Sequence, residues 1–432
     1  MGKKLLLCVL ALTLLLASCA RPGASPTPTE VAPTEEYLDI FELVWQTVNE
    51  NYFDPTFGGL DWNEVRERYR PQIAAAQDDE TFYVTMNKML FELNVSHIGV
   101  VPPGEEEQLE PVLSAEGSVG MDIRLLDGDA VIVSCGPGSP AAQAGLRPGF
   151  VVQRVNGKTV EQWADEVVLI PPLHERNERK RLTAKLQEQF YGPVATTVDL
   201  VYLDAHDEAH EIVLQRAERD GKVDLGAGLP SFYVEFESRR LDQDIGYVRF
   251  NAFIPPIDQR FPEALESLRD TRGLIIDLRG NHGGVFEVRK PLAEQLVQER
   301  TLFWSYKLRD SIEEVYLEPV QDAYGGPLVV LIDVMSASSA EEFSGALQAI
   351  GRAVVVGERS AGVCVRMEVK QLPNGALLMV PFAQTRTADG SVLEGNGVTP
   401  DIEVALDRDL LLQGIDSQLE AAIDYVEGQG AK

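Results

Sequence analysis

The stretch Val329–Gln348, VVLIDVMSASSAEEFSGALQ, decides how the C-terminal half of this chain folds. It opens with an unbroken run of apolar residues, which is typical of a strand covered on both faces of its sheet. Phe343, Leu347 and Ile350 then recur at helical spacing. The segment therefore predicts a buried strand that runs directly into a helix, as in layered α/β domains.

Three serines, Ser336, Ser338 and Ser339, lie where this strand passes into the helix. A serine there would point its hydroxyl beyond the strand ends, where open α/β sheets place their ligands. The unpaired amides of a helix start also suit a developing oxyanion. The same serines would serve equally well as helix N-caps. This segment alone leaves a catalytic and a purely structural role open.

The rest of residues 225–432 alternates strands and helices, which predicts one α/β layered domain. The further predicted strands are Ile245–Phe250, Gly273–Leu278 and Arg352–Gly357, and the predicted helices are Asp258–Leu268, Glu287–Gln298, Ser338–Ile350 and Leu410–Val426. Asn374-Gly375 predicts a hairpin turn.

A glycine-rich loop, DLRGNHGG, follows the predicted strand Gly273–Leu278. Its paired glycines, Gly283 and Gly284, would let the backbone approach a substrate closely and present N–H groups to it. A strand that ends in such a loop, beside a strand that ends in a serine-bearing helix, is a plausible framework for an oxyanion hole.

Residues 37–104 predict a small helical bundle, because apolar residues recur there at steps of three and four. Asp61 and Asp79 are candidate N-caps, and Gly58-Gly59 and Pro71 are expected to interrupt the helices. Residues 111–218 change to short strands, with a hairpin turn at Asp127-Gly128-Asp129. A charged insertion around 174–191 predicts one extra helix with a solvated face.

The N-terminus has the pattern of an export signal. Lys3 and Lys4 precede an apolar run, Leu5–Leu16, that is too short to span a bilayer as a helix. Residues 1–19 end in Leu-Ala-Ser-Cys, and residues 20–36 are rich in Pro, Thr and Ser, which predicts a disordered tether.

Charge and cysteine content exclude several classes of function. The net charge of −30 disfavours nucleic acid as a partner. Cys135 and Cys364 fall in different predicted domains without the spacing of a disulfide framework, so we expect free thiols. No Cys/His cluster has metal-ligand spacing, and we predict neither a metal nor another cofactor.

Four motifs in the C-terminal region, DLRGNHGG, SASSAEEF, GRAVVVGE and EGNGVTPDIEV, resemble those of the tail-specific or carboxyl-terminal processing serine peptidases. That resemblance implies a crotonase-like catalytic domain over 225–432. Within 111–218, GSPAAQAGLRPG and VNG resemble the PDZ domains of exported proteases. The resemblance to PDZ domains implies that one loop of this region offers backbone amides to the C-terminal carboxylate of a peptide. The loop comprises Ser118, Val119, Gly120 and Met121.

The resemblance also assigns catalytic roles. The family's serine motif places the nucleophile at Ser338, with the amide of Ser339 and one from Gly283 or Gly284 as the oxyanion hole. The processing branch uses a lysine base, but its position falls on Val363, and no lysine occurs between Ser338 and Lys370. A Ser-Lys dyad is therefore not expected.

The tricorn-type branch of the family instead takes a histidine from the region before the PDZ domain. Ser96-His97 in FELNVSHIGV matches that signature, and Glu394 matches the branch's glutamate. The implied assembly is Ser338 as nucleophile and His97 as general base, with Ser96 and Glu394 holding the imidazole. His282, within the glycine loop, is the rival base. Glu341 and Glu342 are expected to complement the helix dipole, and Cys364 lacks a visible base.

The sequence thus predicts a multidomain α/β serine peptidase acting on unfolded or C-terminally tagged proteins. Leu16–Cys19 resembles the lipobox of bacterial lipoproteins, which implies that Cys19 is lipidated and that the protein is anchored to a membrane of the cell envelope. A relative of the fold that only binds peptides or ligands, and a PDZ-bearing scaffold, are the alternatives from other functional classes.

Overall fold

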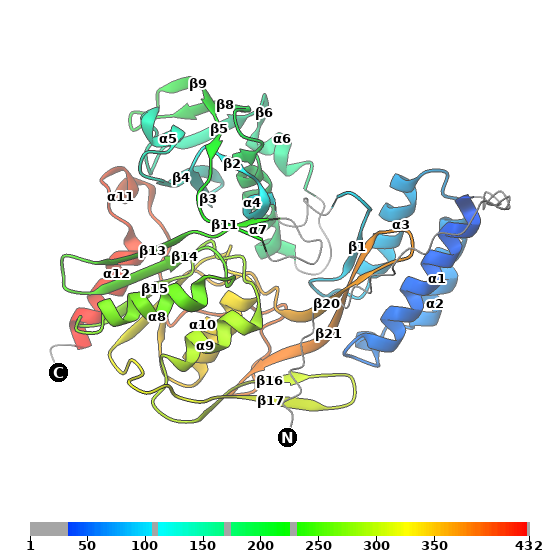
Figure 1. Ribbon diagram of the computed structural model, residues 1–432. Helices are drawn as coiled ribbons and strands as arrows, with labels where there is room; N and C mark the ends of the chain where they lie inside the picture. Colours follow the sequence, from blue (N-terminus) through cyan, green and yellow to red (C-terminus); the bar gives the residue numbers. More distant parts are fainter. Residues whose placement is uncertain (1–32, 106–110, 168–173, 225–230, 430–432) are drawn as a thin grey trace, which may run out of the picture.

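The computed structural model describes residues 33–105, 111–167, 174–224 and 231–429 (Figure 1). The predicted export signal, Cys19 and residues 20–32 of the predicted tether lie outside this range. Helix α1 (Pro33–Asn51) begins before the expected end of the tether at residue 36, so residues 33–36 are helical instead. Within the described ranges, none of the helices combines the length and apolar character needed to cross a membrane.

A six-stranded sheet forms the centre of the C-terminal region. Its strands, in spatial order, are β13 (Phe236–Arg240), β14 (Gly246–Phe250), β15 (Leu274–Asp277), β18 (Leu328–Ile332), β19 (Val354–Gly357) and β22 (Ile402–Glu403). β13 runs antiparallel to β14, and every other neighbouring pair is parallel. All residues of β15 and β18 are buried, as their continuous apolar runs predict.

Helices cover both faces of this sheet. Helices α8 (Ile257–Ser267), α9 (Phe286–Glu294) and α10 (Ser339–Ala349) share one apolar core with it, and α12 (Ser417–Gln429) packs on the other face. The prediction of a single helix over Leu410–Val426 is wrong. The chain forms α11 (Arg408–Leu412), leaves the helical conformation at Gly414 with φ +80°, and starts again at Ser417.

A second sheet joins the N-terminal helices to the C-terminal region. It contains β1 (Gly99–Val101), β21 (Leu377–Thr387), β16 (Thr301–Lys307), β17 (Ile312–Leu317) and β20 (Val365–Gln371). β1 pairs antiparallel with β21, and α1, α2 (Trp62–Ala74) and α3 (Asp79–Phe91) pack against the β20–β21 hairpin (Figure 1). Because β1 starts two residues after His97, this pairing carries His97 to the C-terminal region.

Two local predictions for the helical region need correction. Asp61 caps α2 as predicted, but the cap of α3 is Asp78, whose carboxylate accepts the Thr81 amide, and Asp79 is the first helical residue. Pro71 does not interrupt α2, which continues through it to Ala74.

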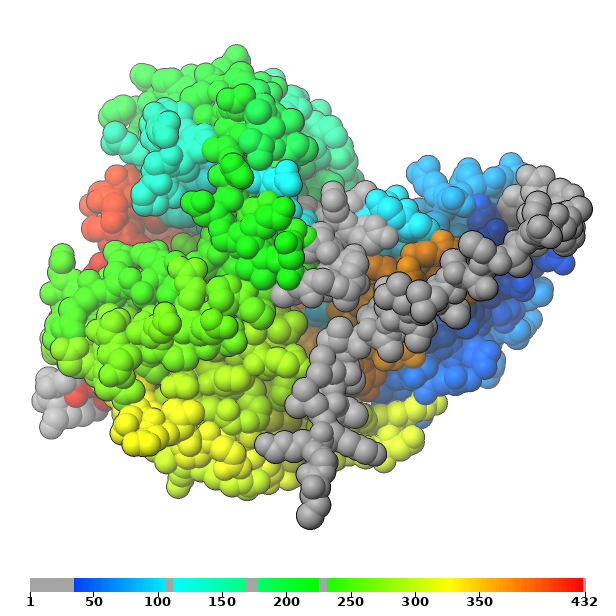
Figure 2. All heavy atoms as spheres, viewed as in Figure 1, coloured from blue at the N-terminus to red at the C-terminus, as the bar shows by residue number. Residues whose placement is uncertain are grey.

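Residues 111–218 form a separate lobe that rests on the C-terminal region (Figure 2). Its main sheet contains β3 (Met121–Leu126), β4 (Asp129–Cys135), β5 (Val151–Val155), β8 (Thr197–Leu203) and β9 (Ala209–Gln215), with β6 (Lys158–Thr159) beside β5.

The shorter helices of the described residues are η1 (Phe57–Gly59), α4 (Pro111–Ser114), α5 (Pro140–Gln143) and α6 (Val160–Ala164). The shorter strands are β2 (Gly117–Ser118), β7 (Tyr191–Gly192), β10 (Ala217–Glu218), β11 (Lys222–Val223) and β12 (Phe232–Tyr233).

The predicted extra helix is present as α7 (His174–Glu188), but it also has a buried side that its charged sequence does not predict. Leu186 and Thr183 are fully buried. The guanidinium of Arg179 makes two hydrogen bonds to the Glu358 carboxylate, of 2.7 and 3.2 Å, and so connects α7 to the C-terminal region.

A buried ion pair also connects the two lobes. Arg124 on β3 donates from Nε to Asp333 Oδ2 at 2.6 Å, and both side chains are almost fully buried. Asp333 follows β18, and its Oδ1 accepts the amides of Gly280, Met335 and Ser336. Burial alone would raise the pKa of Asp333, but Arg124 and the Gly280 amide, with a smaller contribution from Arg279, outweigh it and lower that pKa.

We predict that Arg124→Ala lowers the free energy of unfolding by about 3–5 kcal/mol, because it leaves a buried carboxylate without its countercharge. Urea denaturation followed by circular dichroism measures the loss. Arg300→Ala is the control, since the Arg300–Glu318 pair is exposed and should contribute less than about 1 kcal/mol. Equal effects of the two substitutions would contradict this account of the interface.

Candidate active site

Ser338 lies in the tight turn between β18 and α10, directly before the first helical residue. Its backbone has φ +53° and ψ −117°, a conformation that residues with a side chain rarely adopt. Ser338 is partly exposed, whereas Ser336 and Ser339 are buried. Strained backbone of this kind concentrates at functional sites, and a sharp strand-to-helix turn is a known way to present a nucleophilic serine.

Ser336 is a structural residue of this turn. Its hydroxyl donates to the carbonyl of Leu278, at the end of the neighbouring strand, at 2.8 Å. The amide of Ala337 donates to the carbonyl of Asn281. The serine turn and the glycine loop are therefore fixed to each other, and the sequence had suggested only that they lie side by side.

Glu341 does more than complement the dipole of α10. Its carboxylate is fully buried and accepts four hydrogen bonds. Oε2 accepts the amides of Ser338 and Val363, at 3.1 and 2.9 Å, and Oε1 accepts the Ser360 hydroxyl and the Gly362 amide, both at 2.6 Å. Burial raises the pKa of Glu341 despite these donors. This carboxylate ties the Ser338 backbone to the segment 360–363.

His97, Ser96 and Glu394 form one hydrogen-bonded network. Ser96 Oγ lies 2.8 Å from His97 Nδ1 and 2.9 Å from Glu394 Oε2, and the Ser96 amide donates to Glu394 Oε1 at 2.7 Å. The Ser96 hydroxyl has one proton, and a carboxylate can only accept it. Ser96 Oγ must then accept the proton on His97 Nδ1. In the neutral ring, this leaves Nε2 with a free lone pair.

The environment of His97 keeps its ring neutral. Burial is the larger cause and the positive charge of Lys180 on α7 the smaller one, and together they lower the pKa of His97 to about 4. The ring is thus unprotonated near pH 7 and able to accept a proton. Like Ser338, His97 has a positive φ, of +54°.

The segment Val363–Cys364 connects this network to Ser338. The Cys364 amide donates to Glu394 Oε2 at 2.7 Å, and the Ser338 amide donates to the Val363 carbonyl at 3.0 Å. Cys364 Sγ also lies 3.8 Å from the Ser338 carbonyl. Cys135 and Cys364 are both free, as predicted. Burial raises the pKa of Cys364 well above its ordinary value, so this thiol is not activated as a nucleophile.

Gly283 lies directly against the serine turn. A Cβ at this position would come within 2.8 Å of Ser338 Cβ and 3.0 Å of the Ser339 nitrogen, so only glycine fits. Its own amide donates to Asn281 Oδ1 at 2.9 Å. Of the two expected glycine donors, Gly283 is therefore already engaged. The amides of Gly284 and Ser339 donate to no other group in the described part of the chain.

Comparison with known proteins shows which family this chain resembles. A family model described as Peptidase family S41 matches residues 244–404, and one described as Tricorn protease C1 domain matches residues 33–91. The carboxyl-terminal-processing protease of Synechocystis sp. is 28% identical over 430 residues, which cover 97% of this chain and 93% of the relative. The chain belongs to the carboxyl-terminal processing serine peptidases.

Other relatives and solved structures are similar over most of this chain. A tricorn protease homologue of Streptomyces coelicolor is 26% identical over 93% of this chain, which covers 32% of that longer protein. The photosystem II D1 C-terminal processing protease superposes with a TM-score of 0.57 at 23% identity, covering 87% of this chain and 96% of that one. Mature CPAF in complex with lactacystin gives 0.63 at 14% identity, covering 92% and 98%. These structures share the fold of helices and sheets in several domains.

The rival base, His282, directly precedes Gly283 in the glycine loop and lines a cleft of this peptidase. It borders a cleft of about 440 Å³ between the two lobes, together with Arg124, Arg249 and Met121. Burial lowers the pKa of His282 to about 4, with smaller contributions from Lys180 and Arg124. The network of Ser96 and Glu394 surrounds His97 and not His282.

The loop Ser118–Met121 borders the same cleft. The amide of Val119 donates to the Phe190 carbonyl, and the amide of Gly120 donates to Ser118 Oγ at 2.9 Å. Two of the amides expected to bind a peptide carboxylate are thus hydrogen-bonded within the lobe. Binding a carboxylate through them would require the loop to rearrange.

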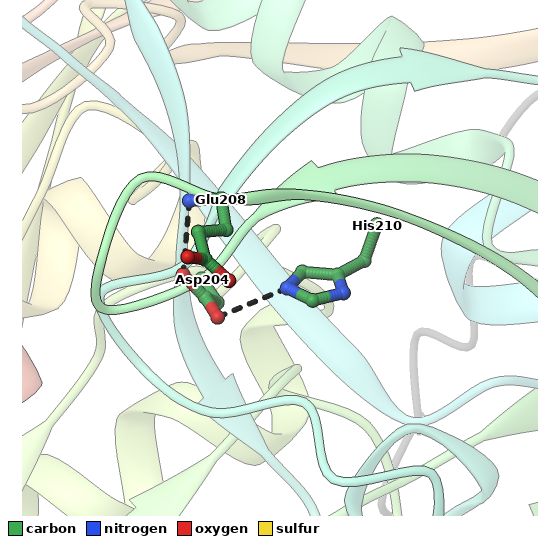
Figure 3. A group of neighbouring side chains, drawn as sticks. All are labelled: Asp204, Glu208 and His210. Carbon is green, nitrogen blue, oxygen red and sulfur yellow. Dashed lines mark hydrogen bonds and ion pairs between the residues drawn. The ribbon is translucent and has the colours of Figure 1, made fainter.

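One group outside the active site has side chains of the kind that bind metals. Ligand atoms of Asp204, Glu208 and His210 lie within 4.8 Å of one another at the β8–β9 turn (Figure 3). Asp204 accepts the amides of His206 and Glu208 and pairs with His210 Nε2 at 2.9 Å. These contacts account for the arrangement of an exposed polar turn without an ion. The group contains one histidine and no cysteine, so it does not form a Cys/His cluster in the sequence.

The depressed pKa of His97 predicts a wide pH range of activity. The ring must be neutral to accept a proton, so kcat/KM should stay constant from about pH 8 to pH 5.5 and fall only as the pH approaches 4. Lys180→Ala removes a positive charge and should move this acid limb to higher pH. Lys185→Ala on the same helix is the control. An acid limb centred near pH 6.5 in the unmodified enzyme would contradict the assignment.

Proposed function

We propose that this peptidase is an exported, lipid-anchored endopeptidase that cleaves unfolded or C-terminally tagged proteins through an acyl-enzyme on Ser338. The mechanism rests on the hydrogen bonds around His97. The Ser96–Glu394 network leaves Nε2 of His97 as an acceptor and is joined to the Ser338 backbone through Val363–Cys364. A neutral base and a serine in a strained turn meet the requirements of nucleophilic catalysis.

The steps follow from these roles. As Ser338 Oγ attacks the peptide carbonyl, its proton passes to His97 Nε2, and the carbonyl oxygen becomes an oxyanion. The amides of Ser339 and Gly284 donate to that oxyanion. The imidazolium returns its proton to the leaving amine, and the C–N bond breaks. Water, deprotonated by His97, then attacks the ester and releases Ser338.

Glu394 acts through Ser96 in this scheme. Once His97 is protonated, its Nδ1–H still donates to Ser96 Oγ, and Ser96 Oγ still donates to the carboxylate. The negative charge of Glu394 therefore stabilises the imidazolium across one hydroxyl. This arrangement supports the tricorn-type branch. The branch with a lysine base is disfavoured, because the corresponding position holds Val363.

Substrate delivery rests on the lobe at 111–218, which we assign as PDZ-like, beside a crotonase-like catalytic domain. Its loop Ser118–Met121 borders the interdomain cleft together with Arg249. Arg249 pairs with Asp122 at 3.2 Å, so a peptide carboxylate that reached this loop would compete with Asp122 for that positive charge. The substrates are proteins or peptides, and no nucleic acid is expected, given the net charge of −30.

We predict that Ser338→Ala lowers the hydrolysis of a casein-like substrate by about three orders of magnitude or more. A serine-directed fluorophosphonate should label the unmodified protein stoichiometrically and leave the variant unlabelled. Mass spectrometry of the labelled peptide identifies the residue. Full activity in Ser338→Ala would remove the proposed nucleophile, and an unlabelled native protein would argue for a binding role.

A matched pair of substitutions distinguishes the roles of His97 and His282. His97→Ala should lower kcat by about 10²–10⁴-fold, the usual contribution of a general base, and His282→Ala by less than about tenfold. Both kcat and KM are measured on the same peptide. If His282→Ala gave the larger loss, the roles of the two rings would be exchanged.

The anchor is tested separately. Cys19 should carry the lipid and hold the protein in the membrane fraction of the cell envelope, so Cys19→Ser should release it and end the incorporation of radiolabelled fatty acid. Cys8→Ser, earlier in the signal, is the control and should leave both unchanged. Membrane retention of Cys19→Ser would refute the lipid anchor.

A further inference from the structure

We infer that the side chain of Ser339, held by Arg289, is a positioning group that fixes the two oxyanion donors relative to each other. The inference rests on the proposed function. It goes beyond it because the proposed function uses only the backbone amide of Ser339. No part of the mechanism above needs its hydroxyl.

The Ser339 hydroxyl connects the two sides of the proposed oxyanion hole. Ser339 Oγ donates to the carbonyl of Gly284 at 2.7 Å, and Arg289 Nη1 donates to Ser339 Oγ at 2.7 Å. A guanidinium only donates, so the single hydroxyl proton is directed at Gly284. The same two residues supply the two amides that have no other acceptor in the chain as described. One side chain therefore joins the two residues whose amides are the proposed donors.

Hydrogen bonds with two residues, Phe253 and Ser339, hold the backbone at Gly284. A Cβ at Gly284 would lie 2.3 Å from the Phe253 carbonyl oxygen, and its φ is +142°, so the position is restricted to glycine. Glycine has the greatest backbone freedom of any residue, and Gly284 is also exposed. Phe253 holds both peptides that flank Gly284, through bonds to the Gly283 carbonyl and the Val285 amide. The Ser339 hydroxyl adds a bond to the Gly284 carbonyl, which lies in the second of these peptides.

Arg289 is fixed from several sides. It is 4% exposed, on α9, and its Nη2 donates to the Tyr306 hydroxyl at 3.0 Å. It forms an ion pair with the buried Glu342 of α10, and its guanidinium lies over the Trp304 ring, 4.5 Å from the centroid. Thr385 Oγ1 donates to Glu342 in turn.

A contribution to stability alone does not explain the buried ion pair between Arg289 and Glu342. The desolvation of two buried charges largely cancels their attraction, and apolar residues of similar size often stabilise a protein as well or better. A rigid donor aimed at Ser339 Oγ is a more specific use of these groups. Enzymes commonly hold their reacting groups with packed, hydrogen-bonded neighbours of this kind.

The test is Ser339→Ala, which removes only the hydroxyl and keeps the backbone amide. Because the donors act on charge that develops in the transition state, kcat should fall by roughly 10- to 100-fold with little change in KM. Affinity for a peptide boronate, which forms a tetrahedral adduct with the serine, should fall by the same factor. Affinity for the matching peptide amide, which is bound without an adduct, should not change.

Ser344→Ala is the matched control. Ser344 is equally buried on α10, and its hydroxyl donates to the Ala340 carbonyl at 2.7 Å, away from the glycine loop. This variant should keep kcat and boronate affinity. Ser339→Cys is the second variant, since it fills the same space with a weaker donor and should lose less than Ser339→Ala. It also serves if Ser339→Ala fails to fold.

The outcomes separate the two proposals. Fluorophosphonate labelling of the unmodified enzyme at Ser338 is measured first, and its absence would overturn both. If the enzyme is labelled but Ser339→Ala keeps its kcat and its boronate affinity, only the positioning role is overturned. Equal losses of boronate and amide affinity would indicate a general loss of structure and would also overturn it.

Discussion

Two half-buried or buried carboxylates hold the active site together by accepting backbone amides from one short segment. Glu341 accepts the amides of Gly362 and Val363, and Glu394 accepts the amide of Cys364. Burying a carboxylate is costly unless its oxygens are hydrogen-bonded, and bonds from N–H groups to an ionised acceptor are among the strongest in proteins. Each carboxylate also holds one candidate catalytic residue: Glu341 the Ser338 backbone, and Glu394 the serine that orients His97.

The hydrogen bonds of Glu394 join residues that are far apart in the sequence and close together in the fold. Position 97 is brought to the C-terminal region because β1 pairs with β21, so that Gly99 faces Met379. The apolar core of α1, α2 and α3 includes residues of the β20–β21 hairpin, and this packing holds the strand in register. The helical region is therefore part of the site. An isolated C-terminal region would keep Ser338 and Glu394 but lack Ser96 and His97.

The sequence was most informative where local pattern and chemistry coincide. The buried strand of Val329–Ile332, the serine turn and the helix after it follow from apolar runs and helical spacing alone. The function of Glu341 did not, because a glutamate in the first turn of a helix usually interacts with the helix dipole at the surface. Only the fold shows that segment 360–363 covers it. The same reason explains α7, whose charged sequence conceals the contact of Arg179 with Glu358.

Errors at element boundaries have equally physical causes. Apolar periodicity continues from Leu410 to Val426, yet Gly414 adopts a positive φ and splits the helix. Pro71 lies three residues before the end of α2 and is accommodated there. Such outcomes depend on tertiary packing that a local pattern does not contain.

The valine at position 363, where the processing branch has its lysine, belongs to a segment whose backbone is used in the site. A base from segment 360–364 would require a side chain directed at Ser338, but here the segment contributes its backbone instead. The amides of Val363 and Cys364 point to two different carboxylates, while the Val363 carbonyl accepts the Ser338 amide. With its polar groups used in this way, the segment fixes the position of a base that comes from elsewhere in the chain. A substitution of Val363 by lysine would therefore not by itself restore a Ser-Lys dyad, because Glu394 would still hold Ser96, and through it His97, in place.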